Sequence, residues 1–427
     1  MTITAFEGPA GSGKTHRLMD ELIAVLERAP LQAHQRVLAV TYMHGSRRRL
    51  DSRLAAIVPL KGRYEAVVLD GFAWRLIQRW RRLVAHLGYA APQEHDFDAC
   101  CELAARLMEI DHVAAWVKAT FPIMLVDEAQ DFCAHRSAIV TALSRTITVL
   151  VAFDEFQCLQ PDLRPVPIQA WLAANAEPIS LTGNHRTNRA QLLAAADAVR
   201  QGARVVDGGR EFKLVPTPGL PLMATWLANA IRFRDGANVA VLTPTRMGPA
   251  QAAVARVCAG PIGRHGSGPF EIRWENTDEQ EVETKWAGVG LDGQCSVADA
   301  VAALHAQRDD PILLRTRDWL KHKERTLGIE SIHAAEIRGQ VERLITRRRQ
   351  FGDRREARFC AMTIHQAKNR EFDDVVVIWP HRVPTGDDQR RRLLYNAITR
   401  ARRRCTVLVQ AASLLQTPPF SPAAEAA

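Results

Sequence analysis

The chain has 427 residues, of which 47% are hydrophobic and 24% charged, a balance typical of globular proteins with several domains. No apolar run approaches the ~20 residues of a membrane helix, and the first residues lack the features of a signal peptide, which excludes secretion and membrane insertion and predicts a cytoplasmic protein with no membrane partner. The formal charge of +9 favours a polyanionic partner such as nucleic acid, because Lys and Arg release counterions from a phosphate backbone.

Short apolar runs alternate with longer helical stretches along the chain. The first group of predicted strands is Ile3–Phe6, Arg36–Thr41, Tyr64–Leu69, Pro122–Val126, Ile147–Phe153 and Pro178–Leu181. The second group is Asn238–Thr243, Phe359–Ile364, Asp374–Trp379 and Cys405–Gln410. The longest predicted helices are Gly71–Leu87, Asp96–Thr120, Asn188–Gln201 and Ala334–Arg348. Nearly continuous hydrophobic strands indicate parallel sheets covered on both faces, so the pattern predicts an α/β fold with two doubly wound parallel sheets.

The two groups of strands predict two sheet domains, each with a small helical insertion. A Gly-rich start and an acidic patch interrupt the alternation after the strand Asn238–Thr243. The predicted parts are a first domain at 1–180 with an insertion at about 87–120, a second domain at 181–259 plus 350–415, an insertion into it at 260–349, and a disordered tail at 416–427.

A phosphate-binding motif follows the first predicted strand. Its residues, Gly8, Pro9, Ala10, Gly11, Ser12, Gly13, Lys14 and Thr15, match G-x-x-x-x-G-K-[ST] and open a predicted helix. Backbone N–H groups of such a loop surround phosphate oxygens, and the helix N-terminus adds a favourable dipole. We expect Lys14 to reach the β- and γ-phosphates of ATP and Thr15 to bind Mg²⁺.

Two carboxylates follow the apolar strand Pro122–Val126. Because carboxyl ends of parallel strands share one edge of a sheet, Asp127 and Glu128 should lie beside the phosphate loop. Asp127 is expected to hold Mg²⁺, directly or through water. Glu128 is the expected base that orients the attacking water.

The segment Asp127-Glu128-Ala129-Gln130-Asp131 resembles motif II of the UvrD/Rep/PcrA-like superfamily 1 helicases. Further segments resemble the other motifs of that family in order: Leu38–Ser46 motif Ia, Leu69–Leu76 the segment that follows it, Ala152–Gln157 motif III, Leu181–Thr187 motif IV, Met362–Phe372 motif V and Leu393–Ala401 motif VI. The resemblance implies two RecA-like P-loop domains with ATP bound at their interface.

The resemblance also assigns roles to residues outside the phosphate loop. It implies that Gln157 senses the γ-phosphate, that Arg186 contacts it, that Arg400 is an arginine finger, and that Glu371 lies near the ribose. The residues expected to contact DNA are Thr41, Tyr42, Arg47, Phe72, Thr363 and His365. Tyr42 and Phe72 are the aromatic residues expected against bases.

The leading hypothesis is an ATP-dependent translocase or helicase that moves 3′ to 5′ on single-stranded or tailed DNA. The alternative is a regulatory UvrD-like ATPase subunit of a nuclease or phage-defence complex with little unwinding of its own. Two departures favour the alternative: the insertions are small, and Cys158–Pro161 replaces the aromatic residues that the family carries after Gln157. RNA remains open as a substrate, because the motifs do not reveal the sugar.

Overall fold

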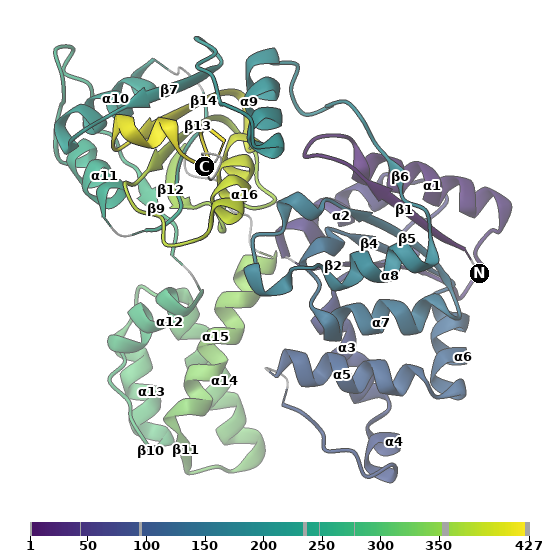
Figure 1. Ribbon diagram of the computed structural model, residues 1–427. Helices are drawn as coiled ribbons and strands as arrows, with labels where there is room; N and C mark the ends of the chain where they lie inside the picture. Colours follow the sequence, from purple (N-terminus) through teal and green to yellow (C-terminus); the bar gives the residue numbers. More distant parts are fainter. Residues whose placement is uncertain are drawn as a thin grey trace. The chain divides into compact units, whose positions relative to one another are not determined.

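The computed structural model describes residues 2–42, 44–93, 96–233, 237–246, 248–276, 278–351 and 358–422. The chain forms two compact units, a larger one of Met1–Ile272 with Thr363–Ala427 and a smaller one of Arg273–Met362. The larger unit contains two sheets of parallel strands with helices around them, and the smaller unit is mainly helical (Figure 1).

The first sheet occupies the N-terminal part of the larger unit. Its strands, in spatial order, are β3 (Tyr64–Val68), β2 (Val37–Thr41), β4 (Ile123–Asp127), β5 (Thr148–Phe153), β1 (Ile3–Glu7) and β6 (Ile179–Ser180). All neighbours pair in parallel. The helices of this part are α1 (Lys14–Arg28), α2 (His44–Ala55), α3 (Leu69–Arg79), α4 (Arg81–His86), α5 (Phe97–Met108), α6 (Asp111–Thr120), α7 (Ala134–Ser144) and α8 (Pro167–Asn175).

Helices cover both faces of the first sheet because its strands carry apolar side chains on both sides. Val37 and Ala39 pack in a buried cluster with residues of α1 and α2. Leu38 and Val40 pack on the other face with residues of α3, α5 and α7. Successive side chains of a strand point to opposite faces, so a strand covered on both sides reads as a continuous hydrophobic run.

The predicted insertion at 87–120 is part of this core. Helix α5 buries Cys101, Ala104 and Leu107 in the same cluster as Phe72 and Val126. The segment therefore adds a helical layer to the first sheet.

The second sheet lies in the C-terminal part of the larger unit. Its strands there are β7 (Phe212–Pro216), β14 (Ala401–Val409), β13 (Phe372–Trp379) and β8 (Val239–Thr243), in that order and all parallel. Its helices are α9 (Ala190–Gln201), α10 (Leu220–Arg232), α11 (Pro249–Ala259) and α16 (Asp387–Ile398). The predicted α/β fold with two parallel sheets is confirmed, which agrees with two RecA-like domains.

The smaller unit has a helical core of its own. Its elements are β9 (Arg273–Trp274), α12 (Asp278–Ala287), β10 (Gln294–Ser296), α13 (Val297–Ala306), α14 (Pro311–Leu327), β11 (Ser331–His333), α15 (Ala334–Phe351) and β12 (Phe359–Thr363), whose last residue belongs to the larger unit. It begins and ends later than the predicted 260–349. The reason is that residues 260–272 pack against α10 and α11, where Ser267 contacts Arg232 and Cys258 contacts Ile272.

The tail predicted as disordered at 416–427 is folded as far as residue 422. The ring of Phe420 packs edge-on against Trp379 with centroids 5.7 Å apart, and its carbonyl accepts a hydrogen bond from the Val205 N–H at 2.8 Å. One buried aromatic residue thus anchors a segment whose Pro and Ala content suggested disorder. Residues 423–427 lie outside the described part of the chain.

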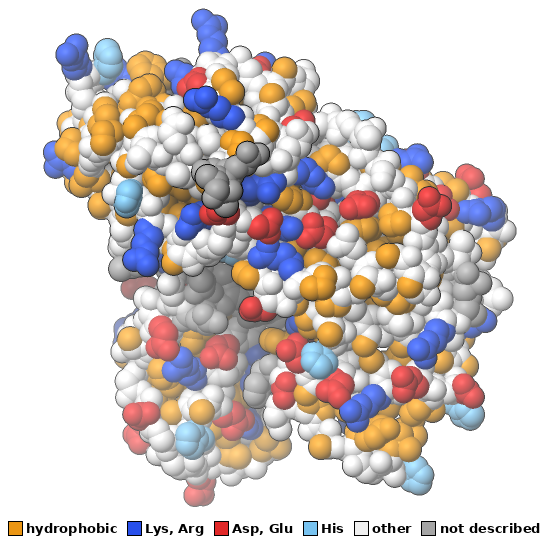
Figure 2. Space-filling view, viewed as in Figure 1, with side chains coloured by type: hydrophobic (Ala, Val, Ile, Leu, Met, Phe, Trp, Pro, Cys, Tyr) orange, Lys and Arg blue, Asp and Glu red, His pale blue; other side chains and the backbone are white. Residues whose placement is uncertain are grey.

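Among the helices that the structure describes, none is both long and apolar enough to cross a membrane. On the face of the larger unit in Figure 2, hydrophobic side chains gather over α10, where Leu220, Leu222 and Phe233 are exposed. Elsewhere on this face, Lys and Arg side chains are interspersed with Asp and Glu.

Candidate active site

The phosphate loop joins β1 to α1 and has the backbone of a tight anion-binding turn. Gly11 and Gly13 have φ of 83° and 85°, a region that favours glycine. A Cβ at Gly13 would lie 2.9 Å from the His185 ring, and one at Gly11 would lie 2.7 Å from the Asn184 side chain. Only glycine therefore fits at these two positions, as expected for a loop that surrounds phosphates.

Lys14 is buried at the start of α1 and folds back over the loop. Its Nζ donates hydrogen bonds to the carbonyl oxygens of Gly8 (2.8 Å) and Pro9 (3.0 Å). These weak neutral acceptors hold the ammonium group above the loop, where phosphate oxygens would be stronger partners.

The side chains expected at Mg²⁺ lie together at the end of β4. The Thr15 hydroxyl is 3.2 Å from Oδ2 of Asp127. Burial and the neighbouring Glu128 raise the pKa of Asp127 to about 7. A hydroxyl and a carboxylate are the oxygen ligands that Mg²⁺ takes together with substrate phosphates, and a cation there would favour the ionised carboxylate. These two residues therefore fit Mg²⁺ held together with substrate phosphates, and no group of three or more acidic, His or Cys side chains that could hold a metal ion occurs among the described residues.

Glu128 is held in an unusual backbone conformation with its carboxylate oriented. Its φ of 59° is left-handed, which is rare for a residue with a side chain and is common at functional sites. Oε2 accepts a hydrogen bond from Gln130 at 2.5 Å. Burial acts to raise the pKa of Glu128, but Lys14 and Lys368 outweigh it, so the net shift is downward. An ionised, oriented carboxylate is what a residue that orients water requires.

Gln157 follows β5 and connects the first sheet to Arg400. Its Nε2 donates to Oδ2 of Asp154 at 2.8 Å, which leaves Oε1 to accept from Arg400 Nη2 at 3.2 Å. The backbone N–H of Asp154 in turn donates to Gln130 at 3.0 Å. Both the nitrogen and the oxygen of the Gln157 side-chain amide, expected to sense the γ-phosphate, are therefore held by hydrogen bonds.

Arg400 is 1% exposed, directly after α16. Its Nε donates to the Asn396 carbonyl at 3.1 Å. Burial and the cation of Arg186 lower the pKa of Arg400 to about 9, with Glu128 acting in the opposite direction. The structure therefore brings this predicted arginine finger to Gln157 and into the electrostatic field of Glu128.

Arg186 and Glu371 bind each other. Arg186 Nε donates to Glu371 Oε1 at 2.9 Å and Nη1 donates to the Thr399 carbonyl at 2.8 Å. Arg402 binds the other carboxylate oxygen at 2.9 Å. Although burial acts to raise it, Arg186 and Arg402 lower the pKa of Glu371 to about 2. Glu371, expected beside a ribose, is here the counter-ion that holds Arg186 in place.

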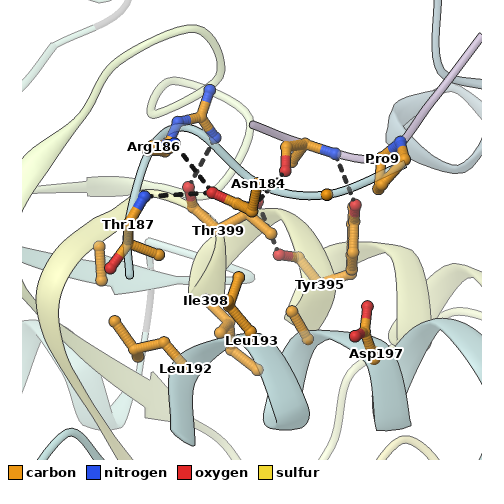
Figure 3. A pocket seen from close by; sticks show the side chains of 14 residues that line it. Pro9, Asn184, Arg186, Thr187, Leu192, Leu193, Asp197, Tyr395, Ile398 and Thr399 are labelled. Atoms are coloured by element: carbon orange, nitrogen blue, oxygen red, sulfur yellow. Dashed lines mark hydrogen bonds between the residues drawn. The ribbon is translucent and has the colours of Figure 1, made fainter. Parts of the chain in front are cut away.

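Several contacts at the site are made by residues to which the sequence assigned no role. Asn184 donates from Nδ2 to the Ala10 carbonyl at 2.9 Å, and the Tyr395 hydroxyl accepts from the Ala10 N–H at 2.8 Å (Figure 3). Lys368 contacts the Asp131 carboxylate and donates to the Gln157 carbonyl at 2.9 Å. All four side chains belong to the motif segments quoted above, but motif spacing alone did not indicate their partners.

A cavity of about 200 Å³ lies beside the loop, between α9 and α16. Leu192, Leu193 and Ile398 line it with apolar side chains, and Pro9 and Asn184 line it next to the loop (Figure 3). The loop therefore contacts a hollow in the second sheet's helical layer.

The residues expected to contact DNA divide into buried and accessible ones. Phe72 is 3% exposed and packs edge-on against Phe121, with centroids 6.3 Å apart, so its ring belongs to the core, and its contact with DNA stays a prediction. Thr41 is fully buried at the end of β2, and its contact with DNA also stays a prediction. Both positions are core positions because the first sheet is covered on each face.

The other four expected DNA-contacting residues keep some accessible surface. Tyr42 is half-buried, with the Arg136 guanidinium 5.2 Å from its ring centre, and Arg47 is half-buried on α2. Thr363 is half-buried and His365 is exposed. Their contact with DNA stays a prediction.

Residues 358–408 match the family of UvrD-like helicase C-terminal domains. The match covers the segments that resemble motifs V and VI, and it confirms the UvrD-like superfamily 1 resemblance. No curated protein matches the sequence.

Solved structures similar to this chain include Arterivirus nonstructural protein 10 (helicase), alone and in complex with DNA, at 14% and 12% identity and a TM-score of 0.39 in both cases. Each alignment covers 97% of this chain but only 61% or 62% of the viral chain, so this chain spans about three fifths of their length.

Proposed function

We propose that this chain, with its UvrD-like helicase C-terminal domain at 358–408, is an ATP-dependent translocase or helicase acting 3′ to 5′ on single-stranded or tailed DNA. The observation that carries the proposal is the hydrogen bond from Arg400 to Gln157. It places a buried cation of the second sheet beside a residue that is fixed at the end of the first sheet. Cations facing a phosphate loop are what phosphoryl transfer from ATP requires.

The proposed chemistry assigns one task to each group. Lys14 binds the β- and γ-phosphates, and Thr15 and Asp127 hold Mg²⁺, which neutralises charge on the transferred phosphoryl group. Glu128 orients the attacking water and accepts its proton. Gln157 and Arg400 stabilise the negative charge that develops on the phosphoryl oxygens.

ATP hydrolysis by the purified full chain, measured without polymer and with single-stranded DNA, duplex DNA or RNA, tests the proposal. We expect hydrolysis that single-stranded DNA stimulates, and loss of activity in Lys14→Ala and Glu128→Gln. Normal turnover in either variant would contradict the mechanism. If only RNA stimulated ATP hydrolysis, the substrate would be RNA and not DNA.

The alternative, a regulatory ATPase subunit of a nuclease complex, is favoured by one observation at the expected DNA surface. The two residues after Gln157 are Cys158 and Leu159. Both are buried, and neither has an aromatic ring. Aromatic stacking contributes about 1–3 kcal/mol per base to single-strand binding, which these residues do not supply. Strand displacement on 3′- and 5′-tailed duplexes distinguishes the candidates: unwinding of the 3′-tailed duplex by the chain alone rejects the regulatory role.

A further inference from the structure

Arg200, near the end of α9, contacts a buried carboxylate at the active site. Its Nη1 donates to Oδ1 of Asp154 at 2.9 Å, and Asp154 is 0% exposed. The guanidinium also lies 5.4 Å from the ring centre of Phe156 and 5.6 Å from that of Tyr395. The ion pair and the two rings together fix the position of this cation.

The same carboxylate lies close to the lysine of the phosphate loop. Oδ2 of Asp154 is 4.0 Å from Lys14 Nζ, a distance at which two charges attract but do not yet share a hydrogen bond. Lys14 instead donates to the carbonyls of Gly8 and Pro9. Asp154 thus lies between two cations, of which Arg200 makes the close contact, and its Oδ2 also accepts the hydrogen bond from Gln157 at 2.8 Å.

A buried carboxylate needs a cation, and removing one partner of a buried pair leaves a charge that is strongly unfavourable. If Arg200 were absent, Lys14 would be the cation closest to Asp154. A rotation of the Lys14 side chain would close the 4.0 Å gap to a hydrogen bond. A charge-assisted bond to a carboxylate is stronger than the bonds of Lys14 to neutral carbonyls. Lys14 would then be drawn from the loop towards Asp154.

We propose that Arg200 is a positioning residue that neutralises Asp154 and thereby keeps Lys14 free to bind the phosphates of a nucleoside triphosphate. This inference rests on the proposed function and explains how Lys14 stays available for nucleotide binding. Arg200 acts through Asp154, not by contact with the nucleotide.

Tyr395 links this arrangement to the loop backbone. Its hydroxyl oxygen accepts hydrogen bonds from Arg200 Nη1 at 3.3 Å and from the Ala10 N–H at 2.8 Å, so both of its lone pairs are used. Figure 3 shows the Tyr395 hydroxyl directed at the loop next to Pro9. Tyr395 therefore fixes the position of Arg200 relative to the phosphate loop at Ala10.

The test is the affinity of the full chain for a fluorescent ATP analogue with Mg²⁺, measured at equilibrium. We expect Arg200→Met, which keeps the length of the side chain but removes its charge, to weaken binding about tenfold or more, which is 1.4 kcal/mol or more. Arg200→Lys keeps the charge and should retain affinity within about threefold. The matched control is Arg189→Met, at the start of the same helix, where the side chain is 48% exposed and pairs with Glu211.

Rescue by Asp154→Asn distinguishes the electrostatic role from a purely structural one. The double variant Arg200→Met with Asp154→Asn lacks the carboxylate that would attract Lys14, so it should bind within about threefold of Asp154→Asn alone. A structural role for Arg200 would leave the double variant at least as weak as Arg200→Met. Failure of this rescue overturns the proposal, as does wild-type affinity in Arg200→Met.

Nucleotide binding distinguishes a failure of the role of Arg200 from a failure of the proposed function. Nucleotide binding by the wild type with unchanged binding in Arg200→Met overturns only the role of Arg200. A wild-type chain that binds no nucleotide overturns the proposed function itself. Should Arg200→Met not fold, as thermal unfolding would show, a tenfold loss of affinity in the charge-conserving Arg200→Lys contradicts the proposal.

Discussion

Glu128 is half-buried and Arg400 is buried, and the ionisation of both charges is set by their neighbours. Burial alone disfavours the charged form of both. The cations of Lys14 and Lys368 nevertheless hold the pKa of Glu128 below its usual range. Burial and Arg186 lower the pKa of Arg400 to about 9, which still leaves it mainly charged at neutral pH. The site thus presents an ionised carboxylate and a desolvated cation, and electrostatic stabilisation is strongest where water is excluded.

Arg400→Ala should lower the kcat of ATP hydrolysis on the order of 10³-fold or more, because it removes the buried cation beside Gln157. Nucleotide affinity should change less than about tenfold, since Lys14 and the loop remain. Steady-state hydrolysis and equilibrium binding check this. Arg390→Ala on α16, where Arg390 pairs with Asp387 at 3.0 Å on the surface, is the control. A kcat within about threefold of wild type would remove Arg400 from the mechanism.

Glu371→Gln should destabilise the protein in a pH-dependent way. The pKa of Glu371 falls from the ordinary 4.5 to about 2 in the folded chain. A depressed carboxylate pKa stabilises the folded state fully above the unfolded value and loses that contribution as pH falls towards the folded one. The difference in urea midpoint between wild type and Glu371→Gln should therefore be largest at pH 5–7 and shrink from about pH 4.5 to 2.

Glu102→Gln provides the control for this titration. Glu102 pairs with Arg106 on the surface of α5, with its side chain 47% exposed, and such pairs contribute about 0–1 kcal/mol. Its urea midpoint should follow wild type across the pH range. A constant deficit for Glu371→Gln down to pH 2 would mean that packing, not the carboxylate charge, holds Arg186.

Among the elements, hydrophobic runs predicted every strand of the first sheet, including its edge strands β3 and β6, but not the edge strand β7 of the second sheet. The strands β2, β4 and β5 lie within their sheet, are covered on both faces, and end within a residue or two of the predicted bounds. The edge strand β7 was missed because Phe212–Pro216 is only partly buried and contains a lysine and a proline. The signal is a run of apolar residues, which burial of both faces of a strand produces and which β7, with its lysine and proline, lacks.

Helix boundaries show a related limit. The predicted helix Gly71–Leu87 is two helices, α3 and α4, that meet at Trp80, and Asp96–Thr120 divides at Ile110. Apolar periodicity continues across both junctions, since the two helices of each pair pack on the same core. The extended backbone of Ile110, with φ of −87° and ψ of 121°, is a turn that periodicity does not reveal.

Phe72→Ala should act on stability because α3 buries this ring in the core. Loss of a buried phenylalanine costs about 3–5 kcal/mol, including the cavity left behind. Thermal or urea unfolding without DNA measures this loss. The matched control is Phe97→Ala in α5, whose ring is 51% exposed and whose loss should cost much less. If Phe72→Ala left the unfolding midpoint unchanged but weakened DNA binding, Phe72 would contribute to DNA contact and not to the core.

For the molecule as a whole, the sequence predicted which segments supply the residues of the candidate site, but not how those residues contact one another. The loop, Asp127 and Glu128 could be placed because one sheet orders them. The bonds of Arg400 to Gln157 and of Tyr395 to Ala10 join segments hundreds of residues apart. Such contacts depend on how side chains of the two sheets pack, which motif order does not encode. The same packing placed Glu371 on Arg186, where the family resemblance implied a ribose.

Because both sheets contribute to one site, nucleotide binding should stabilise the chain. A non-hydrolysable ATP analogue with Mg²⁺ at about 100 times its Kd should add about 2.7 kcal/mol to the free energy of unfolding and raise the melting temperature. Chelation of Mg²⁺ should reduce this shift, since the carboxylate of Asp127 then faces the phosphates without a cation between them. Differential scanning calorimetry of the full chain measures both effects.

Lys14→Ala is the informative comparison for this shift. It removes the cation that we propose binds the β- and γ-phosphates but leaves the glycine turn of the loop intact. Its melting temperature should therefore be nearly independent of the analogue. An equal shift in wild type and Lys14→Ala would mean that the analogue stabilises the chain at another surface, and the site between the loop and Arg400 would no longer account for binding.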